Sequence, residues 1–276
     1  LCGLAINAMA GASLPHAAER VEATATLLRE DVAARDFHLT VGSVGQQWLL
    51  RTLSEVGGHD DALRVATQTT QPSWGFWDAN GATTCWENWS GVGDLSHPPP
   101  PTHNHIFLCG GLSAWMHQYL GGISPAEDGY ARVRIAPYVS AKLGPSAVNA
   151  SVSTIRGRVE SAWSRSAAAA EANNDAAGGV ELLRLHVRVP TGTQAEVQLP
   201  LLGRAAGAVL VHESQAGMLW PRSAEPVGAG VGTVGASAGK VHIAIAAGAY
   251  TFILRTRGVS GHGDPNGLLP PSSESM

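Results

Sequence analysis

The pattern of hydrophobic and polar positions changes near residue 125. Before this point apolar side chains recur every three or four residues, as they do along the buried side of a helix. After it, apolar and polar residues alternate, which is typical of strands with one buried face. We therefore expect a helical domain over residues 1–125, a β domain over 126–257 and a tail over 258–276.

Helices are expected wherever the helical period persists between stop signals. The clearest begins after Pro15, and later ones end at the glycine pairs Gly57-Gly58 and Gly121-Gly122. The expected helices are Ala17–Ala34, Gln46–Val56, Asp60–Thr69 and Ile106–Leu120. The segment Gln71–His105 shows no period and is far longer than an ordinary connection, which is typical of a functional loop.

Strands are expected at regular intervals in the second part, with Gly, Pro and Asn between them. They are Arg132–Ile135, Ala147–Ser153, Arg156–Ser164, Leu182–Val189, Ala195–Leu199, Val209–Glu213, Lys240–Ala244 and Tyr250–Arg255. This pattern predicts an antiparallel β-sandwich. Ser166–Gly179 and Pro226–Gly239 are expected to be solvent loops. Residues 258–276 lack an apolar period and end in a Pro/Ser-rich run, so we expect them to be disordered.

Composition excludes some classes of protein. Hydrophobic residues make up 44% of the 276 residues, which is enough for a core. The net charge is -4, and no basic patch suited to a phosphate backbone is visible, so no nucleic-acid partner is expected. No apolar run reaches the length of a membrane span, so no membrane partner is expected either. Nothing in the sequence indicates the compartment.

The three cysteines are far apart in the sequence. Cys2, Cys85 and Cys109 form neither a disulfide framework nor a zinc motif. They are interpreted as buried free thiols. His97, His103 and His105 follow one another closely, but no second cluster completes a metal site, so neither a metal nor a cofactor is expected.

The strongest candidate for chemistry lies between residues 73 and 89. This stretch holds four of the eight tryptophans, and the carboxylate of Glu87 lies between Trp86 and Trp89 in the sequence. Aromatic faces suit the apolar C–H faces of sugars, and a carboxylate among indoles is expected to be desolvated, with a raised pKa useful for proton transfer. The alternative is that the tryptophans are core residues and Glu87 is a capping residue. A match to the dinucleotide G-x-G-x-x-G pattern at Gly230–Gly235 lacks a following helix, so it predicts no such site.

An ordered series of motifs resembles the bacterial and fungal α-L-rhamnosidases of glycoside hydrolase family 78. The most specific is Ala-Thr-Thr-x-Trp-Glu-x-Trp at residues 82–89. The others are His38–Gly42, Trp48–Leu50, Pro72–Gly75, Asn104-His105, Tyr119–Pro125, Gly129-Tyr130, Ile135–Pro137, Gly157–Trp163 and Val187–Pro190. The resemblance covers roughly residues 38–200.

This resemblance implies a fold and an activity. The family has an (α/α)6 six-hairpin barrel followed by a C-terminal β-sandwich, and it hydrolyses terminal α-L-rhamnosides with inversion. Glu87 falls on the position of the general base. His105 falls on that of a histidine that contacts the sugar or its water. Trp74, Trp86 and Trp89 would line the sugar pocket.

The resemblance also implies that part of the active site lies elsewhere. The family's general acid precedes the region matched here, so the chain is expected to be a partial barrel that carries the general-base half of the site. The missing N-terminal part of the same polypeptide is then its partner, besides the carbohydrate substrate. We expect the chain alone to be unstable or inactive. The alternatives are a non-catalytic carbohydrate-binding module, carried by the sandwich, and a degenerate structural remnant.

Overall fold

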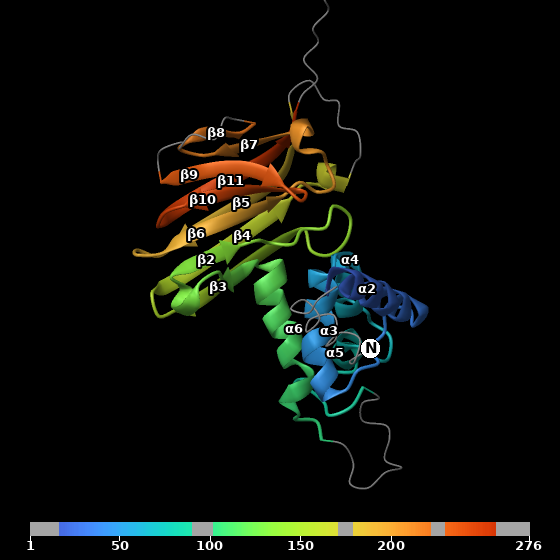
Figure 1. The fold of residues 1–276 in the computed structure, drawn as a ribbon. Helices are drawn as coiled ribbons and strands as arrows, with labels where there is room; N and C mark the ends of the chain where they lie inside the picture. Colours follow the sequence, from blue (N-terminus) through green and yellow to red (C-terminus); the bar gives the residue numbers. More distant parts are fainter. Residues whose placement is uncertain (1–16, 90–101, 171–178, 222–229, 258–276) are drawn as a thin grey trace, which may run out of the picture.

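The computed structural model describes residues 17–89, 102–170, 179–221 and 230–257. The helices lie together on one side of the molecule and the strands form a separate body on the other (Figure 1). The described α-helices are α2 (Ala17–Ala34), α3 (Ser43–Glu55), α4 (His59–Ala66), α5 (Trp74–Ala79) and α6 (Gly110–Trp115). The expected disordered tail, His97 and Cys2 lie outside the described residues.

Two helical predictions are corrected by the structure. The segment expected to be a loop contains α5, which begins after Ser73, whose Oγ accepts a 2.9 Å hydrogen bond from the Phe76 N–H. The helix expected over Ile106–Leu120 is broken into a 3-10 turn at Ile106–Leu108, α6, and a π-helical turn at Met116–Leu120. The break coincides with glycines: a Cβ on Gly111 would lie 2.5 Å from Oε1 of Gln46. This absence of a side chain lets α6 approach α3 closely.

A core of aliphatic and indole side chains holds the helical part together. Leu28, Leu49, Leu53 and Trp77 are all at most 3% exposed. Trp115 of α6 is also buried, and its indole Nε1–H donates a 2.8 Å hydrogen bond to Ser54 Oγ of α3. This bond satisfies a buried polar group while the ring fills the space between the two helices.

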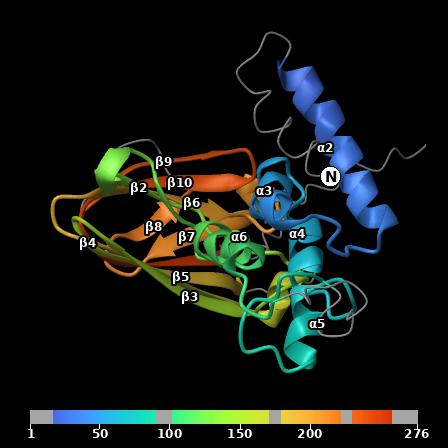
Figure 2. The ribbon, with the colours of Figure 1, turned by 90° about the horizontal axis from the view of Figure 1, so that it is seen from below.

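Two sheets form the predicted sandwich, seen edge-on in Figure 2. One has the order β1-β2-β6-β10-β9 and the other β3-β4-β5-β11-β7-β8. The strands are β1 (Ile123–Pro125), β2 (Arg132–Ile135), β3 (Ala147–Thr154), β4 (Gly157–Arg165), β5 (Glu181–Val189), β6 (Gln194–Pro200), β7 (Val209–Glu213), β8 (Gly217–Trp220), β9 (Val231–Ser237), β10 (Lys240–Ile245) and β11 (Gly248–Thr256). The described pairs are antiparallel except β2–β6, which is parallel. The inward side chains form one core between the sheets, with Val197, Leu185 and Phe252 fully buried.

Three strands, β1, β8 and β9, were not predicted from the sequence. The expected loop Pro226–Gly239 is wrong from residue 231 onward, where β9 pairs with β10 at the edge of its sheet. Its small residues and a register shift in this pairing hide the alternation that marks a strand. The Gly230–Gly235 motif therefore runs into a strand, in agreement with the expectation that it is not a dinucleotide site.

A tight glycine turn joins the helical part to the sandwich. Gly122 has φ +74°, and a Cβ there would lie 2.2 Å from the backbone nitrogen of Pro137. Beside this turn, Tyr138 stacks on His59 at 3.8 Å between ring centroids and donates a 2.6 Å hydrogen bond to Asp60. These contacts fix the helices that carry the candidate site against the sandwich.

Candidate active site

Two segments that flank the candidate site pair with each other. The His105 N–H donates to the Cys85 carbonyl at 2.7 Å, and the Glu87 N–H donates to the Thr102 carbonyl at 2.9 Å. The Thr84 hydroxyl also donates to the His103 carbonyl. We call this pairing of residues 84–87 with residues 102–105 the ladder. It brings Glu87 and His105, which are 18 positions apart in the sequence, to neighbouring places.

A hollow of about 360 Å³ opens beside the ladder. Its lining combines one carboxylate, one imidazole, one indole and small polar groups. The lining residues are Gly42, Ser43, Glu87, Asn88, Trp89, His105 and Leu108. The structure therefore brings together three of the five residues predicted from the sequence. Ser43 and Asn88 were not predicted, because neither carries a signal that separates it from an ordinary surface residue.

Glu87 is more exposed than the sequence analysis expected. Its side chain faces solvent, and Oε2 accepts a 2.7 Å hydrogen bond from the Thr102 N–H. The expected desolvation by indoles is not observed, because Trp86 turns into the core and does not cover the carboxylate. The Thr102 N–H holds one carboxylate oxygen in a defined place.

His105 is half-buried, and its ring contacts Phe107 edge-on at 5.2 Å between centroids. Its Nδ1 is buried and makes no hydrogen bond to the described residues. Nδ1 therefore faces the protein interior. The part of the half-buried ring that lines the hollow is the part that a ligand can reach.

The tryptophans divide into two roles. Trp74 and Trp86 are 8% and 5% exposed and belong to the core of the helical part, where Trp74 Nε1 donates to the Leu108 carbonyl at 2.7 Å. Trp89 is half-buried, stacks on Trp77 at 4.7 Å and donates to the Val41 carbonyl at 2.7 Å. Of the three tryptophans predicted to line a sugar pocket, Trp89 alone lines the hollow; the structure places Trp74 and Trp86 behind it.

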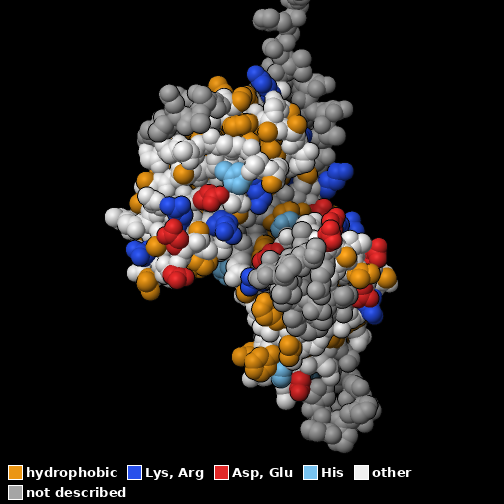
Figure 3. Space-filling view, viewed as in Figure 1, with side chains coloured by type: hydrophobic (Ala, Val, Ile, Leu, Met, Phe, Trp, Pro, Cys, Tyr) orange, Lys and Arg blue, Asp and Glu red, His pale blue; other side chains and the backbone are white. Residues whose placement is uncertain are grey.

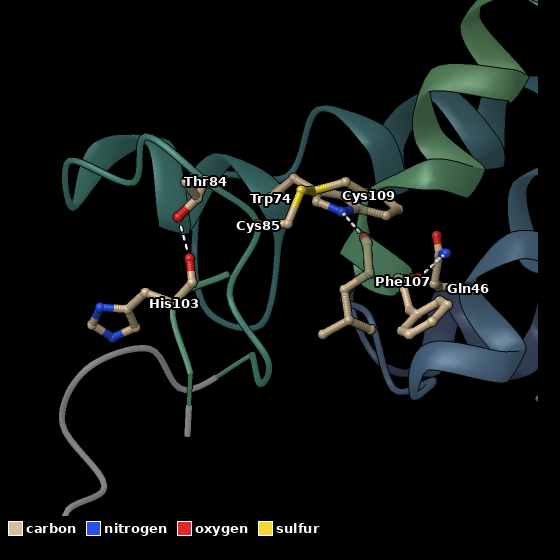
Figure 4. Close-up of a disulfide and its surroundings, with 8 residues drawn as sticks. Gln46, Trp74, Thr84, Cys85, His103, Phe107 and Cys109 are labelled. Atoms are coloured by element: carbon tan, nitrogen blue, oxygen red, sulfur yellow. Dashed lines mark hydrogen bonds between the residues drawn. A yellow bond between two sulfur atoms is a disulfide. The ribbon is translucent and has the colours of Figure 1, made fainter. Parts of the chain in front are cut away.

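Cys85 and Cys109 form a disulfide, so their interpretation as free thiols is wrong. Figure 4 shows the bond next to the indole of Trp74. The pairing could not be read from the sequence, because the two residues are 24 positions apart and only the ladder brings them together.

Within the described residues, no group of three or more acidic, histidine or cysteine side chains could hold a metal ion, and no helix is long and apolar enough to cross a membrane.

An apolar groove of about 760 Å³ lies between α3 and α6. Hydrophobic side chains are visible on the surface of the helical part, at its lower left in Figure 3. Three hydrophobic side chains along it are strongly exposed: Val44 (64%), Ile106 (70%) and Phe107 (61%). Trp48 and Arg51 complete one wall, with the Arg51 guanidinium 5.9 Å from the Trp48 ring. Exposed hydrophobic clusters of this kind are typical of surfaces that bind another protein or a ligand.

Comparison with protein families divides the chain at the same glycine turn. Residues 5–120 match the bacterial alpha-L-rhamnosidase 6 hairpin glycosidase domain, and residues 122–214 match the bacterial alpha-L-rhamnosidase C-terminal domain. The chain belongs to the bacterial α-L-rhamnosidase family. Its helical part is thus a portion of a six-hairpin domain, and its sandwich is the C-terminal domain of the same family.

Similar curated proteins are α-L-rhamnosidases of much greater length. That of Streptomyces avermitilis is 30% identical over 200 residues, and that of Formosa agariphila is 32% identical over 175 residues. These alignments cover 71% and 63% of this chain but 17% of each relative. The chain therefore spans about a sixth of the length of these proteins.

Solved structures of rhamnosidases superpose on most of the chain. That of the Streptomyces avermitilis α-L-rhamnosidase in complex with L-rhamnose has a TM-score of 0.71 and 25% identity, covering 91% of this chain and 21% of that one. That of the Aspergillus terreus enzyme has a TM-score of 0.66 and 23% identity, covering 91% and 23%. The second comparison supports the fold alone. Together they confirm the predicted order of a partial six-hairpin barrel and a sandwich.

Proposed function

We propose that this chain carries the general-base half of the active site of an inverting α-L-rhamnosidase, which releases terminal α-L-rhamnose from rhamnosides. An inverting glycosidase uses one carboxylate to activate water and a second carboxyl group, about 6.5–9.5 Å away, to protonate the leaving oxygen. The observation that carries the proposal is the hollow that Glu87, Trp89 and His105 line together.

Each of these residues has a role suited to its surroundings. Glu87 is the proposed base: its exposed carboxylate is within reach of water, and the Thr102 N–H holds Oε2. His105 lines the hollow with a half-buried imidazole, whose Nε2 can hydrogen-bond a sugar hydroxyl or the attacking water. Trp89, fixed through its indole N–H, offers an apolar face to the sugar ring.

The second carboxyl group is proposed to come from the N-terminal part of the same polypeptide. The curated relatives are about six times as long as the matched region, which leaves room for it. The groove between α3 and α6, with Val44, Ile106 and Phe107 exposed, is the proposed docking surface for that part. We expect the chain without it to be inactive, since it lacks the acid and exposes an apolar surface.

The alternative of a carbohydrate-binding module in the sandwich is not favoured by the structure. Sugar-binding surfaces use exposed aromatic faces. Trp163 is 3% exposed and donates to the Leu120 carbonyl, and Trp220 is half-buried and donates to the Ala206 carbonyl. Both indoles of the described sandwich are thus used in packing.

The test is release of nitrophenol from nitrophenyl α-L-rhamnoside by the full-length parent protein and its Glu87→Gln variant. Removing a general base lowers the rate by about a hundredfold to ten-thousandfold. Glu160→Gln, the same change at a partly exposed glutamate of the sandwich, is the matched control and should keep full activity. Proton NMR of the first-formed rhamnose reports inversion. A fully active Glu87→Gln variant would refute the role of Glu87, and inactivity of the parent itself would favour the degenerate remnant.

A further inference from the structure

We propose that the disulfide between Cys85 and Cys109 is a positioning element of the active site, which holds Glu87 and His105 in register and makes activity depend on the oxidised state. The proposal rests on the proposed function of Glu87 and His105. The bond closes a loop that contains both residues: Cys85 lies two positions before Glu87, and Cys109 lies four positions after His105.

Most of the other hydrogen bonds between the two segments join residues that are exposed to water. Thr84, Glu87, Thr102 and His103, which contribute most of the ladder's hydrogen bonds, are all exposed residues. A hydrogen bond that competes with water contributes little net stability, so the ladder alone opens easily. The disulfide is the only covalent tie between the two segments other than the chain itself within the described residues.

Each end of the disulfide is attached to a rigid part of the molecule. On one side, Trp86 follows Cys85 directly and is buried, in contact with Trp77 at 5.9 Å between ring centroids. On the other side, Cys109 precedes α6, and Leu108 is buried with its carbonyl bonded to Trp74 Nε1. The bond thus joins the core under Glu87 to the start of the helix that follows His105, with 6.0 Å between the two Cα atoms.

The chemistry of the switch is thiol–disulfide exchange. A dithiol reductant donates two electrons and two protons to the Cys85–Cys109 bond, which becomes two thiols, while the dithiol becomes a cyclic disulfide. A small disulfide such as oxidised glutathione reverses the reaction and is itself reduced to two thiols. Both cysteines are half-buried and not sealed in the core, so a small reductant has access.

Hydrogen exchange tests the positioning without any assay of activity. The amides of Glu87 and His105 donate to carbonyls across the ladder. They should exchange about tenfold faster or more in the dithiol-reduced parent protein and in its Cys85→Ala/Cys109→Ala variant. The amides of Leu185 and Phe252, in the core of the sandwich, should be unchanged in both. Equal protection of Glu87 and His105 in the oxidised and reduced forms would overturn the proposal.

Kinetics of the same samples tests the consequence for catalysis. Reduction should lower kcat about tenfold or more, while KM changes less than about threefold. The reason is that a displaced base stabilises the transition state less well but affects substrate binding little. Oxidised glutathione should restore kcat in the wild type but not in the double variant. A Cys2→Ala variant is the control and should respond as the wild type does. Unchanged kcat after complete reduction would overturn the proposal. Inactivity of every form would refute the proposed function, and hydrogen exchange alone would then decide whether the disulfide positions Glu87 and His105.

Discussion

Glu213, at the end of β7, is a buried carboxylate whose replacement should strongly destabilise the sandwich. It is 2% exposed. Oε2 accepts hydrogen bonds from the N–H groups of Gln215 (2.7 Å) and Ala216 (2.8 Å), and Oε1 accepts from the Ser214 hydroxyl (2.8 Å) and the Thr251 N–H (3.2 Å). The carboxylate therefore closes the turn to β8 and ties it to β11.

The size of the effect follows from these four bonds. In Glu213→Gln the amide oxygen can replace one carboxylate oxygen, but the NH2 group then faces two donors. Hydrogen bonds to a charged group contribute about 1.5–3 kcal/mol each, and some of the freed turn donors can reach water. We expect the free energy of unfolding to fall by about 2–4 kcal/mol. Glu160→Gln, at an exposed ion pair with Arg158, should change it by less than about 1 kcal/mol.

The stabilisation by Glu213 should also depend on pH, because it requires the charged carboxylate. Burial raises the pKa of Glu213, but the N–H groups of Ala216 and Gln215, the Ser214 hydroxyl and the Thr251 N–H outweigh it, so the pKa lies below 4.5. Between the folded pKa and 4.5 the unfolded chain binds more protons, so stability rises with pH there. The contribution of Glu213 is complete above about pH 5 and is lost as pH falls through the folded pKa.

Urea unfolding followed by circular dichroism measures both effects. At pH 7 the midpoint of Glu213→Gln should lie about 1–2 M below that of the wild type. The difference should shrink as the pH falls below 4.5. A Glu213→Gln midpoint within the range of Glu160→Gln, or a difference that grows in acid, would show that the four hydrogen bonds do not stabilise the charged form.

Two further predictions concern the helical part. Burial lowers the pKa of His59 from 6.5 to about 4; the nearby Lys240 acts in the same direction and Asp60 in the opposite one. As the pH falls, the unfolded chain therefore binds a proton at this histidine before the folded protein does. The free energy of unfolding should fall as the pH drops from about 6.5 to 4. His59→Phe should remove up to about 3 kcal/mol of this acid sensitivity, seen as a flatter dependence of Tm on pH, and an unchanged slope would contradict it. Gly111→Ala should destabilise the packing of α6 on α3 by about 1–3 kcal/mol in urea unfolding, because its Cβ would clash with Gln46. Gly110→Ala, with open space around the position, is the control and should cause no loss.

Much of the sandwich could be predicted because each strand has one buried face. In β5 the residues Leu183, Leu185, Val187 and Val189 are buried and alternate with polar residues, so the period is visible in the sequence. β9 escaped prediction because glycine and alanine occupy half-exposed positions at a sheet edge. There the strand is specified by its pairing with β10, which the local sequence does not encode.

Only part of the candidate hollow could be predicted from the sequence. The motif placed Glu87 and His105, and the structure brings both to one hollow. The tryptophan-rich composition could not tell which indoles face the core, and burial separates Trp74 and Trp86 from Trp89. The disulfide of Cys85 was missed for the same reason: a contact between distant segments follows from the fold, whereas sequence spacing reports only local order.

The ladder also determines how this protein can evolve. Because the Glu87 N–H donates to the Thr102 carbonyl, these two residues lie side by side although 15 positions separate them in the sequence. The entropy of closing such a stretch grows only slowly with its length. Mutation can therefore lengthen or rewrite residues 90–101 while the carboxylate and the imidazole keep their places. Changes in this stretch and changes at Glu87 or His105 can therefore arise independently of each other.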